Sequence, residues 1–388
     1  MDTSWPATTT ETLGWTSRGE HRRDRSGPYD AAVTAPIAHA DLVMSSELAD
    51  SIAEATAALR VFDASVDAEY APLASVLLRS EAVASSRIEG LTASARALAE
   101  AELGEGQRAN ASVIVANVTA MRAAVALSDT LDAESILAMH RALMVEHPSM
   151  AGRWRTEQVW IGGSFFSPHG ADFVAPAHER VPGAIDDLVA FLARDDMPAV
   201  VQAALAHAQF ETIHPFPDGN GRTGRALLAA VLRARGVTQH VTAPVSSGFL
   251  ARQDDYFAAL GSYRAGAPEP IIGLVAEAAS AAAVSGEGLL SDLAEVRSRW
   301  TPMIAARPDS AVYRVADLLL RQPVVNSAFV SEQLGVAPSI AIRHLRRLAE
   351  TGVLVETAGR ARNRVWRAPD VLEVLDEYAA SAGRRPNR

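Results

Sequence analysis

The sequence predicts a mostly helical protein that carries one β-hairpin near its middle and a winged helix-turn-helix domain at its C-terminus. Three observations support this fold class. Apolar residues recur with helical spacing over most of the 388 residues. A β-prone, glycine-rich stretch interrupts the pattern at residues 155–176, and from Ser310 onward three helical segments precede two short strands. The length is enough for two or three domains.

The N-terminal part divides into a polar segment and a helical region. Residues 1–36 contain Pro, Gly and a cluster of charges, so we expect a flexible N-terminus with partial disorder or a short strand. Residues 37–108 have apolar side chains on helical faces. One helix of this region begins near Pro72 and ends at Gly90, because glycine readily takes the left-handed conformation that closes a helix.

Residues 109–280 are the predicted central domain, in which helices surround the hairpin. After this domain the chain stays helical to about Trp300, and residues 281–309 are a helical linker. Interruptions are expected at residues 266–270 and at Ser285–Gly286. The expected helices of the central domain lie at about 109–127, 132–146, 180–193 and 198–212, and another contains residues 226–232 and stops at Gly236.

Composition excludes several kinds of site. The chain has no cysteine, which excludes disulfides and thiolate zinc sites. All 36 basic residues are arginine, which excludes a P-loop lysine and a Schiff-base lysine. No segment approaches the roughly 18 uncharged apolar residues of a membrane helix, and the N-terminus is polar rather than a signal sequence. We therefore expect a cytoplasmic protein with no membrane partner.

The predicted winged helix-turn-helix domain, residues 310–388, is basic. It has 12 arginines and 8 acidic residues, a net charge of +4, whereas the whole chain has a net charge of −10. Its arginine-bearing third helix fits a DNA groove, but winged helices also bind proteins or form dimers, so DNA, a protein partner and a homodimer all stay open. Its elements are helices at 312–320, 327–334 and 338–350 and strands at 353–356 and 364–366, and the third helix carries Arg343, Arg346 and Arg347.

Segment 214–225 concentrates residues suited to phosphate chemistry. Gly219 and Gly221 permit positive φ, so consecutive backbone N–H groups can form an anion-binding concavity. The turn precedes a helix, whose N-terminus favours phosphate. Arg222 and Arg225 are three residues apart, close enough to grip the same polyphosphate.

Two more residues of this segment have chemistry of their own. Asp218 is a hard oxygen ligand, suited to a Mg²⁺ ion that bridges phosphate oxygens. His214 can take up a proton near neutral pH. Together with the glycine turn, they predict a site for chemistry on a phosphate group.

The segment resembles the signature of Fic-domain proteins, His-x-Phe-x-Asp/Glu-Gly-Asn-Gly-Arg-x-x-Arg. With the matches described next, the resemblance covers about residues 37–280. It implies a helical Fic core that transfers AMP from ATP to a protein hydroxyl and releases pyrophosphate. Every defined signature position is filled here, by His214, Phe216, Asp218, Gly219, Asn220, Gly221, Arg222 and Arg225.

The resemblance assigns a role to each residue of the segment. His214 would be the base that deprotonates the target side chain, Asp218 would hold Mg²⁺, and Phe216 would anchor the loop in the core. Arg225 would pair with the γ-phosphate, and Arg222 would support the phosphates. The implied nucleotide-binding residues are Gly219, Asn220, Gly221, Arg222, Thr223, Gly224 and Arg225.

The pattern Ser85-x-x-x-Glu89-Gly90 looks like the inhibitory motif of the same family. Glu89 lies in the last turn of its helix, where the macrodipole disfavours a negative charge, so we expect a cation nearby. In the family this glutamate pairs with the second signature arginine, here Arg225, and takes the place of the γ-phosphate. The motif precedes the signature in one chain, so the resemblance implies inhibition in cis.

The stretch Trp160, Ile161, Gly162 and Gly163, followed by residues 167–174, resembles the hairpin beside the Fic site, which is called the flap. In the family the flap pairs with an extended target segment by strand addition. The implied partners are therefore ATP, a protein target and the protein itself as a substrate.

The resulting expectation is an autoinhibited protein adenylyltransferase that acts on Ser, Thr or Tyr hydroxyls with Mg²⁺ and ATP. Two alternatives stay open. The same site could remove AMP from a modified protein, with Glu89 orienting water, or the core could be a nucleotide sensor in a DNA-associated regulator. The intact His214 favours transfer over sensing, because a sensor needs no base.

Overall fold

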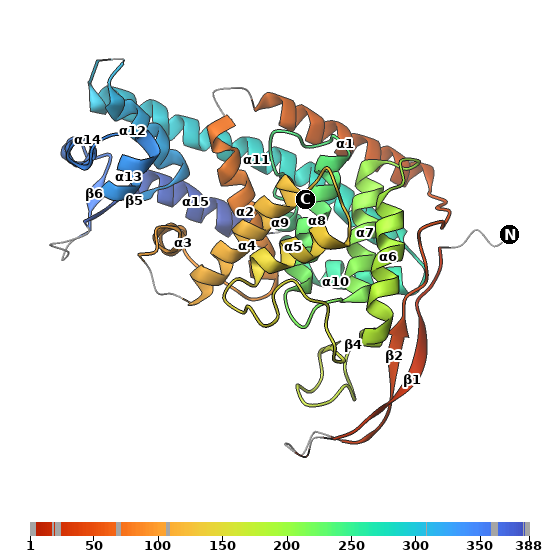
Figure 1. The fold of residues 1–388 in the computed structure, drawn as a ribbon. Coiled ribbons are helices and arrows are strands. Elements are labelled where there is room, and N and C mark those ends of the chain that lie inside the picture. The colour runs from red at the N-terminus through yellow and green to blue at the C-terminus, as the bar shows by residue number, and fades with distance from the viewer. Residues whose placement is uncertain are drawn as a thin grey trace. The chain divides into compact units, whose positions relative to one another are not determined.

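The computed structural model describes residues 5–17, 19, 25–66, 71–105, 109–307, 309–357, 364–382 and 384. Helices dominate the described residues, as the sequence predicts, and short antiparallel strands form three small sheets among them (Figure 1). The chain divides into two compact units, and each is described by itself. The first comprises Met1–Arg60, Thr119–Gln239 and Arg252–Ser280, and the second comprises Val61–Val118, His240–Ala251 and Ala281–Arg388.

Each unit has its own set of elements, and three helices contribute residues to both. The first unit contains β1 (Thr9–Trp15), β2 (Gly27–Val33), α5 (Ala133–Leu143), β3 (Trp160–Ile161), β4 (Phe173–Val174), η2 (His178–Arg180), α6 (Val181–Leu192), α7 (Ala199–Ile213), α8 (Asn220–Ala234) and α10 (Gln253–Arg264). The second contains η1 (Ala71–Leu73), α2 (Ala74–Ile88), α3 (Ala95–Glu102), α9 (Ser246–Ala251), α12 (Ala311–Arg321), β5 (Val324–Asn326), α13 (Ser327–Leu334), α14 (Pro338–Glu350), β6 (Val355–Glu356), β7 (Val365–Arg367) and α15 (Pro369–Ser381). The shared helices are α1 (Ser46–Ser65), α4 (Ala109–Ala126) and α11 (Glu269–Ile304).

Helix α7 is the centre of the first unit. Its residues from Val200 to Ile213 are all buried, as expected of a helix that is apolar on most of its circumference. Helix α8 packs along it, and α6 and α10 also contact it. Gly224 permits the close approach of α8, because a Cβ atom there would lie 2.7 Å from Glu211 Oε1 and 3.0 Å from Phe210 Cδ1. This packing holds both ends of the loop that joins α7 to α8.

The N-terminal segment forms a β-hairpin where the sequence analysis expected partial disorder or a short strand. Strands β1 and β2 pair antiparallel from Thr9–Val33 to Trp15–Gly27. The strands carry few large apolar residues, so local sequence signals were weak, and the hairpin is stabilised instead by burial of Ala31 and Ala32 and by contacts between β2 and β4. Residues 18 and 20–24, which include most of the charge cluster, lie outside the described residues.

Helix α11 is continuous over 36 residues, so the interruption expected at Ser285–Gly286 is wrong. Gly286 is needed for space and not for a turn. A Cβ atom at this position would lie 2.5 Å from Cζ of Phe62, which is fully buried. The glycine therefore lets α1 pack closely on α11 within the second unit, at the usual cost to helix propensity.

The C-terminal part of the second unit contains the three helices and two strands expected there, and also β5 and α15. The strands form one sheet in the order β5-β7-β6. An apolar cluster joins Val324, Val365 and Leu372 to Ala99 of α3, another helix that the sequence analysis did not predict. Short helices such as α3 depend on such packing, because they are marginal in isolation. The assignment to the winged helix fold stays a prediction, and residues 358–363 of the expected wing lie outside the described residues.

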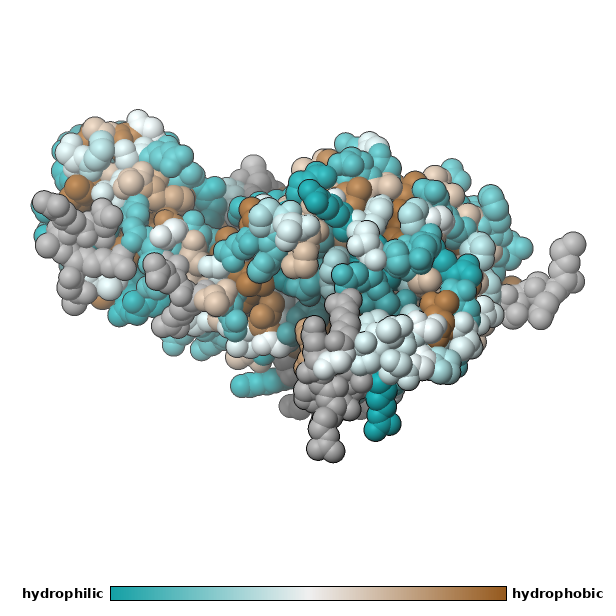
Figure 2. Space-filling view, turned by 60° about the horizontal axis from the view of Figure 1, so that its bottom comes forward, coloured by the Kyte–Doolittle hydropathy of each residue, from teal (hydrophilic) through white to brown (hydrophobic). Residues whose placement is uncertain are grey.

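The surface shown in Figure 2 is mostly hydrophilic, with separate hydrophobic patches. Two described helices, Ala109–Ala126 and Glu269–Ile304, have the length and the apolar character of membrane-spanning helices. Core helices of soluble proteins have these properties as well. Both helices bury part of their surface in the protein, for example at Met121 of α4 and Trp300 of α11.

Candidate nucleotide-binding and catalytic site

The predicted signature lies on the loop between α7 and α8. Helix α7 ends at His214, whose backbone is left-handed with φ 50° and whose N–H donates to the carbonyl of Phe210. Helix α8 begins at Asn220 after Gly219, which also has positive φ, 79°. The two left-handed residues reverse the chain within six residues. Gly219 adopts this conformation without strain, whereas His214 does not.

The inside of the loop is held by Asn220. Its Oδ1 accepts from the N–H of Phe216 and its Nδ2 donates to the carbonyl of Phe216, both at 2.8 Å. The Phe216 ring is fully buried, as the resemblance implied for an anchor. It stacks on His140, with ring centroids 3.6 Å apart, and on Trp154, at 5.0 Å.

Two buried side chains from other segments hold the carbonyl groups of the loop. Arg155 Nε donates to the carbonyl of His214, and the Arg155 backbone N–H donates to that of Pro215, both at 2.9 Å. His140 Nε2 lies 3.0 Å from the carbonyl of Asp218. With the Asn220 bond, the carbonyls of residues 214, 215, 216 and 218 are all engaged by protein donors. Engaging these acceptors leaves the N–H-rich start of α8 as the electropositive side of the loop.

The start of α8 has the features of an anion site. Its N-cap is Gly219, which offers no side-chain cap, so the first-turn N–H groups are not satisfied by a cap. Nε of the buried Arg222 has no hydrogen-bond partner, which is costly for a buried donor unless a ligand supplies the acceptor. A Cβ atom at position 219 would lie 2.8 Å from Leu143 Cδ2, so only glycine fits this turn. These residues fit a phosphate group.

Asp218 stands at the edge of this site. Its side chain is 63% exposed, and its Oδ2 lies 3.3 Å from an Arg222 guanidinium nitrogen. A single accessible carboxylate beside a phosphate site fits a Mg²⁺ ion that takes its remaining ligands from phosphate oxygens and water. No group of three or more His, Asp or Glu side chains that could hold a metal occurs among the described residues.

The imidazole of His214 is oriented by its own helix. Nδ1 lies 3.3 Å from the carbonyl of Glu211 and 3.9 Å from the Glu211 carboxylate. A carbonyl can only accept, so Nδ1 carries the proton and Nε2 has the lone pair that can act as a base. The side chain is 17% exposed, which leaves it reachable from solvent.

Arg225 lies on the buried side of α8 and is 2% exposed. The nearby His207 is a packed helix residue, as expected from its apolar neighbours, and its Nε2 is 2.8 Å from the hydroxyl of Tyr256. Burial, with a further contribution from the charge of Arg225, lowers the pKa of His207 to about 3. The imidazole beside Arg225 is therefore neutral at physiological pH and adds no second positive charge.

The predicted inhibitory residues lie at the end of α2 in the second unit. Gly90 has φ 75° and follows the last turn, which confirms its position as the residue that closes this helix. Ser85 is fully buried, and Glu89 is exposed at the helix end. Arg225 belongs to the first unit, so the pairing of Glu89 with Arg225 stays a prediction.

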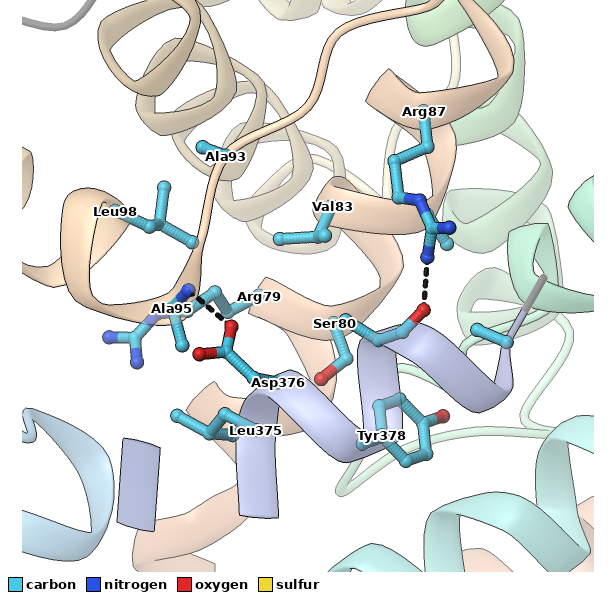
Figure 3. A pocket seen from close by; sticks show the side chains of 13 residues that line it. Arg79, Ser80, Val83, Arg87, Ala93, Ala95, Leu98, Leu375, Asp376 and Tyr378 are labelled. Atoms are coloured by element: carbon cyan, nitrogen blue, oxygen red, sulfur yellow. Dashed lines mark hydrogen bonds between the residues drawn. The ribbon is translucent and has the colours of Figure 1, made fainter. Parts of the chain in front are cut away.

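The end of α2 is fixed within its own unit by α15 (Figure 3). Arg87 donates to the carbonyl of Ala379, and the N–H of Ala95, at the start of α3, donates to Asp376 Oδ1 at 2.7 Å. A small pocket lies between these two contacts and is lined mainly by apolar side chains of α2, α3 and α15. The loop that follows the inhibitory residues is therefore held on both sides by the C-terminal helix.

The predicted flap forms as expected, with Trp160 paired to Val174 and Ile161 paired to Phe173. Gly162 has φ 75°, and a Cβ atom there would lie 1.9 Å from Asp172 Oδ2, so the turn requires glycine. Trp160 donates from Nε1 to the carbonyl of Ser164 at 2.7 Å. Phe165 is 90% exposed and Ile161 is 40% exposed, so the flap presents apolar surface to solvent.

The N-terminal hairpin packs against the flap. The rings of Trp15 and Trp160 meet edge to face, with centroids 5.4 Å apart. The Tyr29 hydroxyl donates to Gln158 Oε1 at 3.3 Å, and His169 Nε2 lies 3.1 Å from the carbonyl of Pro28. Burial of large aromatic side chains contributes most to contacts of this kind, so the hairpin stabilises the flap.

Sequence reasoning missed several residues that build the site. His140 and Arg155 lie 74 and 59 residues before the loop, and only the tertiary fold brings them to it. The same holds for Trp15 against the flap. No local signal marks these two residues in the sequence, because only the fold shows that His140 and Arg155 are almost fully buried.

Comparison with known families supports the resemblance found in the signature. Residues 130–232 match the Fic/DOC family, and residues 49–126 match the Fic/DOC family N-terminal domain. The first match contains α5, the flap, α7 and most of α8. The second contains α2 with the predicted inhibitory residues.

Curated relatives of this region are named protein adenylyltransferases. A protein adenylyltransferase Fic from Nematostella vectensis is 33% identical over 154 residues, which are 38% of this chain and 32% of that protein. A probable protein adenylyltransferase from Aquifex aeolicus is 45% identical over 93 residues, which are 22% of this chain and 29% of that protein. The chain thus matches about a third of the length of these relatives.

One solved structure shares the fold over most of the chain. The crystal structure of a Fic family protein from Desulfovibrio desulfuricans G20 has a TM-score of 0.54 and 21% sequence identity, and the match covers 84% of this chain and 97% of that chain. The likeness supports a common fold over most of the described residues. Residues 130–232 of this chain therefore match the Fic/DOC family and residues 49–126 match its N-terminal domain, and distant homologues of this region are named protein adenylyltransferases.

Proposed function

We propose that this chain is an autoinhibited protein adenylyltransferase. It would transfer AMP from ATP to a Ser, Thr or Tyr hydroxyl of a protein, including its own, and release pyrophosphate. The observation that carries the proposal is the loop between α7 and α8, where the His214 imidazole, a helix N-terminus without a side-chain cap and an accessible carboxylate lie within twelve residues.

In the proposed reaction the target oxygen attacks the α-phosphorus of ATP. His214 Nε2 takes the proton of the hydroxyl, the new oxygen–phosphorus bond forms, and the bond to the bridging oxygen of the β-phosphate breaks. The leaving pyrophosphate carries that bridging oxygen and its electron pair. His214 keeps its orientation because Nδ1–H donates to the carbonyl of Glu211.

The start of α8 would bind the phosphates. Backbone N–H groups after Gly219 and the side chain of Arg222 face charge that increases on the leaving group, which is where oriented donors lower the barrier. Asp218 would hold Mg²⁺, and a bound Mg²⁺ neutralises the phosphate charge. Arg225 would pair with the γ-phosphate. The flap would hold an extended target segment by strand addition, with the N-terminal hairpin supporting it.

Glu89 would restrain the activity by pairing with Arg225 in place of the γ-phosphate. The support for this step is the motif itself, the helix end at Gly90, and the match of the α2 region to the family's N-terminal domain. Removing the carboxylate should therefore increase transfer.

The test is incubation of the purified protein with ATP labelled on the α-phosphate. We expect weak self-labelling by the wild type, strong self-labelling by Glu89→Gly, and none by Glu89→Gly combined with His214→Ala or with Arg225→Ala. Equal labelling by wild type and Glu89→Gly would contradict the autoinhibition. Loss of label from a pre-modified protein on adding unlabelled wild type would favour the reverse activity, the removal of AMP.

A further inference from the structure

We propose that His140 of α5 is a positioning residue for the nucleotide and Mg²⁺ site, because it fixes the backbone of the residue that would hold the metal. The inference rests on the proposed function and extends it to a residue outside the signature. His140 is fully buried and lies 78 residues before Asp218 in the sequence. Its ring nevertheless meets the loop at three residues, Phe216, Asp218 and Gly219.

The two ring nitrogens of His140 have different partners, and these fix the tautomer. The N–H of Gly152 donates to Nδ1 at 3.0 Å, so Nδ1 is the acceptor. Nε2 therefore carries the proton and donates to the carbonyl of Asp218 at 3.0 Å. Each nitrogen can serve its partner in this tautomer only.

The ring also fixes the loop by stacking. Its plane is inclined by 8° to that of Phe216 at a centroid distance of 3.6 Å. A Cβ atom at Gly219 would lie 3.6 Å from Nε2 and Cδ2 of His140, so the turn rests directly on the ring. The His140 side chain thus meets three residues of the loop: Phe216, Asp218 and Gly219.

These contacts set the direction of the groups that face the nucleotide. The bond from His140 fixes the Asp218 carbonyl group, and with it the direction of the N–H groups that follow at the start of α8. It also fixes the backbone position from which the Asp218 carboxylate extends. The Asp218 side chain itself is 63% exposed and is not held by packing. Its position relative to bound phosphate therefore depends on its bond to Arg222 and on its backbone, which His140 holds. Partners of this indirect kind change metal affinity by about 10- to 100-fold when removed.

The experiment measures binding and needs no target protein. The full chain with Glu89→Gly, which removes the proposed competitor of the γ-phosphate, is titrated calorimetrically with α,β-methylene-ATP, which cannot transfer AMP, with and without Mg²⁺. The same chain carrying each further variant is titrated in the same way. His140→Phe keeps the ring and loses both hydrogen bonds. His140→Asn can keep the bond to Gly152 but has no donor at the Nε2 position, whereas His140→Gln places an amide donor near that position.

We expect Mg²⁺ to strengthen binding to the Glu89→Gly chain. In this background, His140→Phe and His140→Asn should lower the affinity measured with Mg²⁺ by about 10- to 100-fold and change the affinity without Mg²⁺ little. His140→Gln should recover part of the loss. The control Ile136→Ala, at a buried position of the same helix, should lower the melting temperature and keep the Mg²⁺ effect.

An unchanged Mg²⁺ effect in His140→Phe and His140→Asn would overturn the inference, and so would an equal loss in Ile136→Ala. No binding of the analogue to the Glu89→Gly chain at any Mg²⁺ concentration would overturn the proposed function and this inference with it. The two failures are distinguishable because the first requires a Glu89→Gly chain that binds.

Discussion

At the scale of single residues, His214 combines a proposed catalytic role with an unfavourable backbone conformation. Its φ of 50° lies in the left-handed region, and the fold holds it there through Arg155, which bonds to its carbonyl. Such conformations cost about 1–3 kcal/mol and persist where the surroundings determine them. The position of the base in space thus depends on contacts from a segment about sixty residues earlier in the sequence.

Replacing His214 should abolish transfer and spare nucleotide binding. Loss of a general base costs about 10²- to 10⁴-fold in rate, while the phosphate-binding groups lie at the start of α8. Both His214→Ala and His214→Asn should behave in this way, and Asn is the matched control for the backbone because it tolerates the left-handed region. Rates of self-labelling in the Glu89→Gly background, beside calorimetric binding of ATP, would check this. Transfer that survives in either variant would reject the role of His214.

His207 makes a contribution to stability that depends on pH. Burial lowers its pKa to about 3, whereas an unfolded histidine has a pKa of about 6.5. Between these values the unfolded state binds the extra proton, so this contribution is complete above about pH 6.5 and is lost as the pH falls toward 3. From pH 6.5 to pH 5 the loss should be about 2 kcal/mol.

Urea unfolding of wild type and His207→Gln at pH 7 and pH 5 would measure this contribution. Between pH 7 and pH 5, the free energy of unfolding should fall by about 2 kcal/mol less in the variant than in the wild type, because glutamine does not titrate. Other acid-sensitive groups affect both proteins alike and cancel in the comparison. Equal losses in the two proteins would show that His207 is not the group responsible.

At the scale of secondary structure, α11 shows where sequence reasoning fails and why. The expected break at Ser285–Gly286 followed from the low helix propensity of glycine. In the fold, Gly286 lies against the Phe62 ring and the helix continues. The same sequence signal has two physical causes, a turn or a close contact, and only the tertiary structure separates them.

Two glycines of α11 provide a matched test of this explanation. Gly288 has no atom within 4 Å of its Cβ position, so Gly288→Ala should stabilise the protein by up to about 1 kcal/mol. Gly286→Ala gains the same propensity but forces its methyl group against Phe62, so a net destabilisation of about 1–3 kcal/mol is expected. Chemical denaturation of both variants would measure the difference. Similar stabilisation by both would contradict the packing role of Gly286.

The elements that were predicted correctly all have strong local sequence patterns. Helices such as α7 and the strands of the flap have strong local patterns, and Gly90 closes α2 as expected. Those that were missed, including the N-terminal hairpin and α3, have weak local patterns and are stabilised by partners distant in sequence. The candidate site divides in the same way, because its signature is contiguous whereas His140 and Arg155 reach it through the fold.

At the scale of the whole molecule, the two units divide the proposed function between them. The first holds the signature loop and the flap, and the second holds α2 with Glu89 and the C-terminal elements. Within the second unit, α15 holds the segments on both sides of Glu89 through Arg87 and Ala95. The proposed inhibitory helix and the C-terminal elements therefore belong to one compact unit, although more than 200 residues separate them in the sequence.

The last prediction concerns DNA binding by the C-terminal elements. Arg347 donates to the carbonyls of Ile304 and Ala305, and Arg364 pairs with Glu356 at 3.2 Å, so these charges are partly used within the protein. Arg343 and Arg346 are exposed on α14. Phosphate contacts from these two arginines of α14 would by themselves give a slope of about −2 for the logarithm of affinity against the logarithm of salt concentration.

We therefore expect the full chain to bind a labelled mixed-sequence duplex weakly at low salt and not at near-physiological salt. Fluorescence anisotropy over a salt series would measure this, and Arg343→Ala combined with Arg346→Ala should remove the residual binding without changing self-labelling in the Glu89→Gly background. That outcome would favour a protein-interaction role, because the net charge of −10 for the whole chain opposes association with nucleic acid. Retention at near-physiological salt with a steep slope would instead assign these elements to DNA.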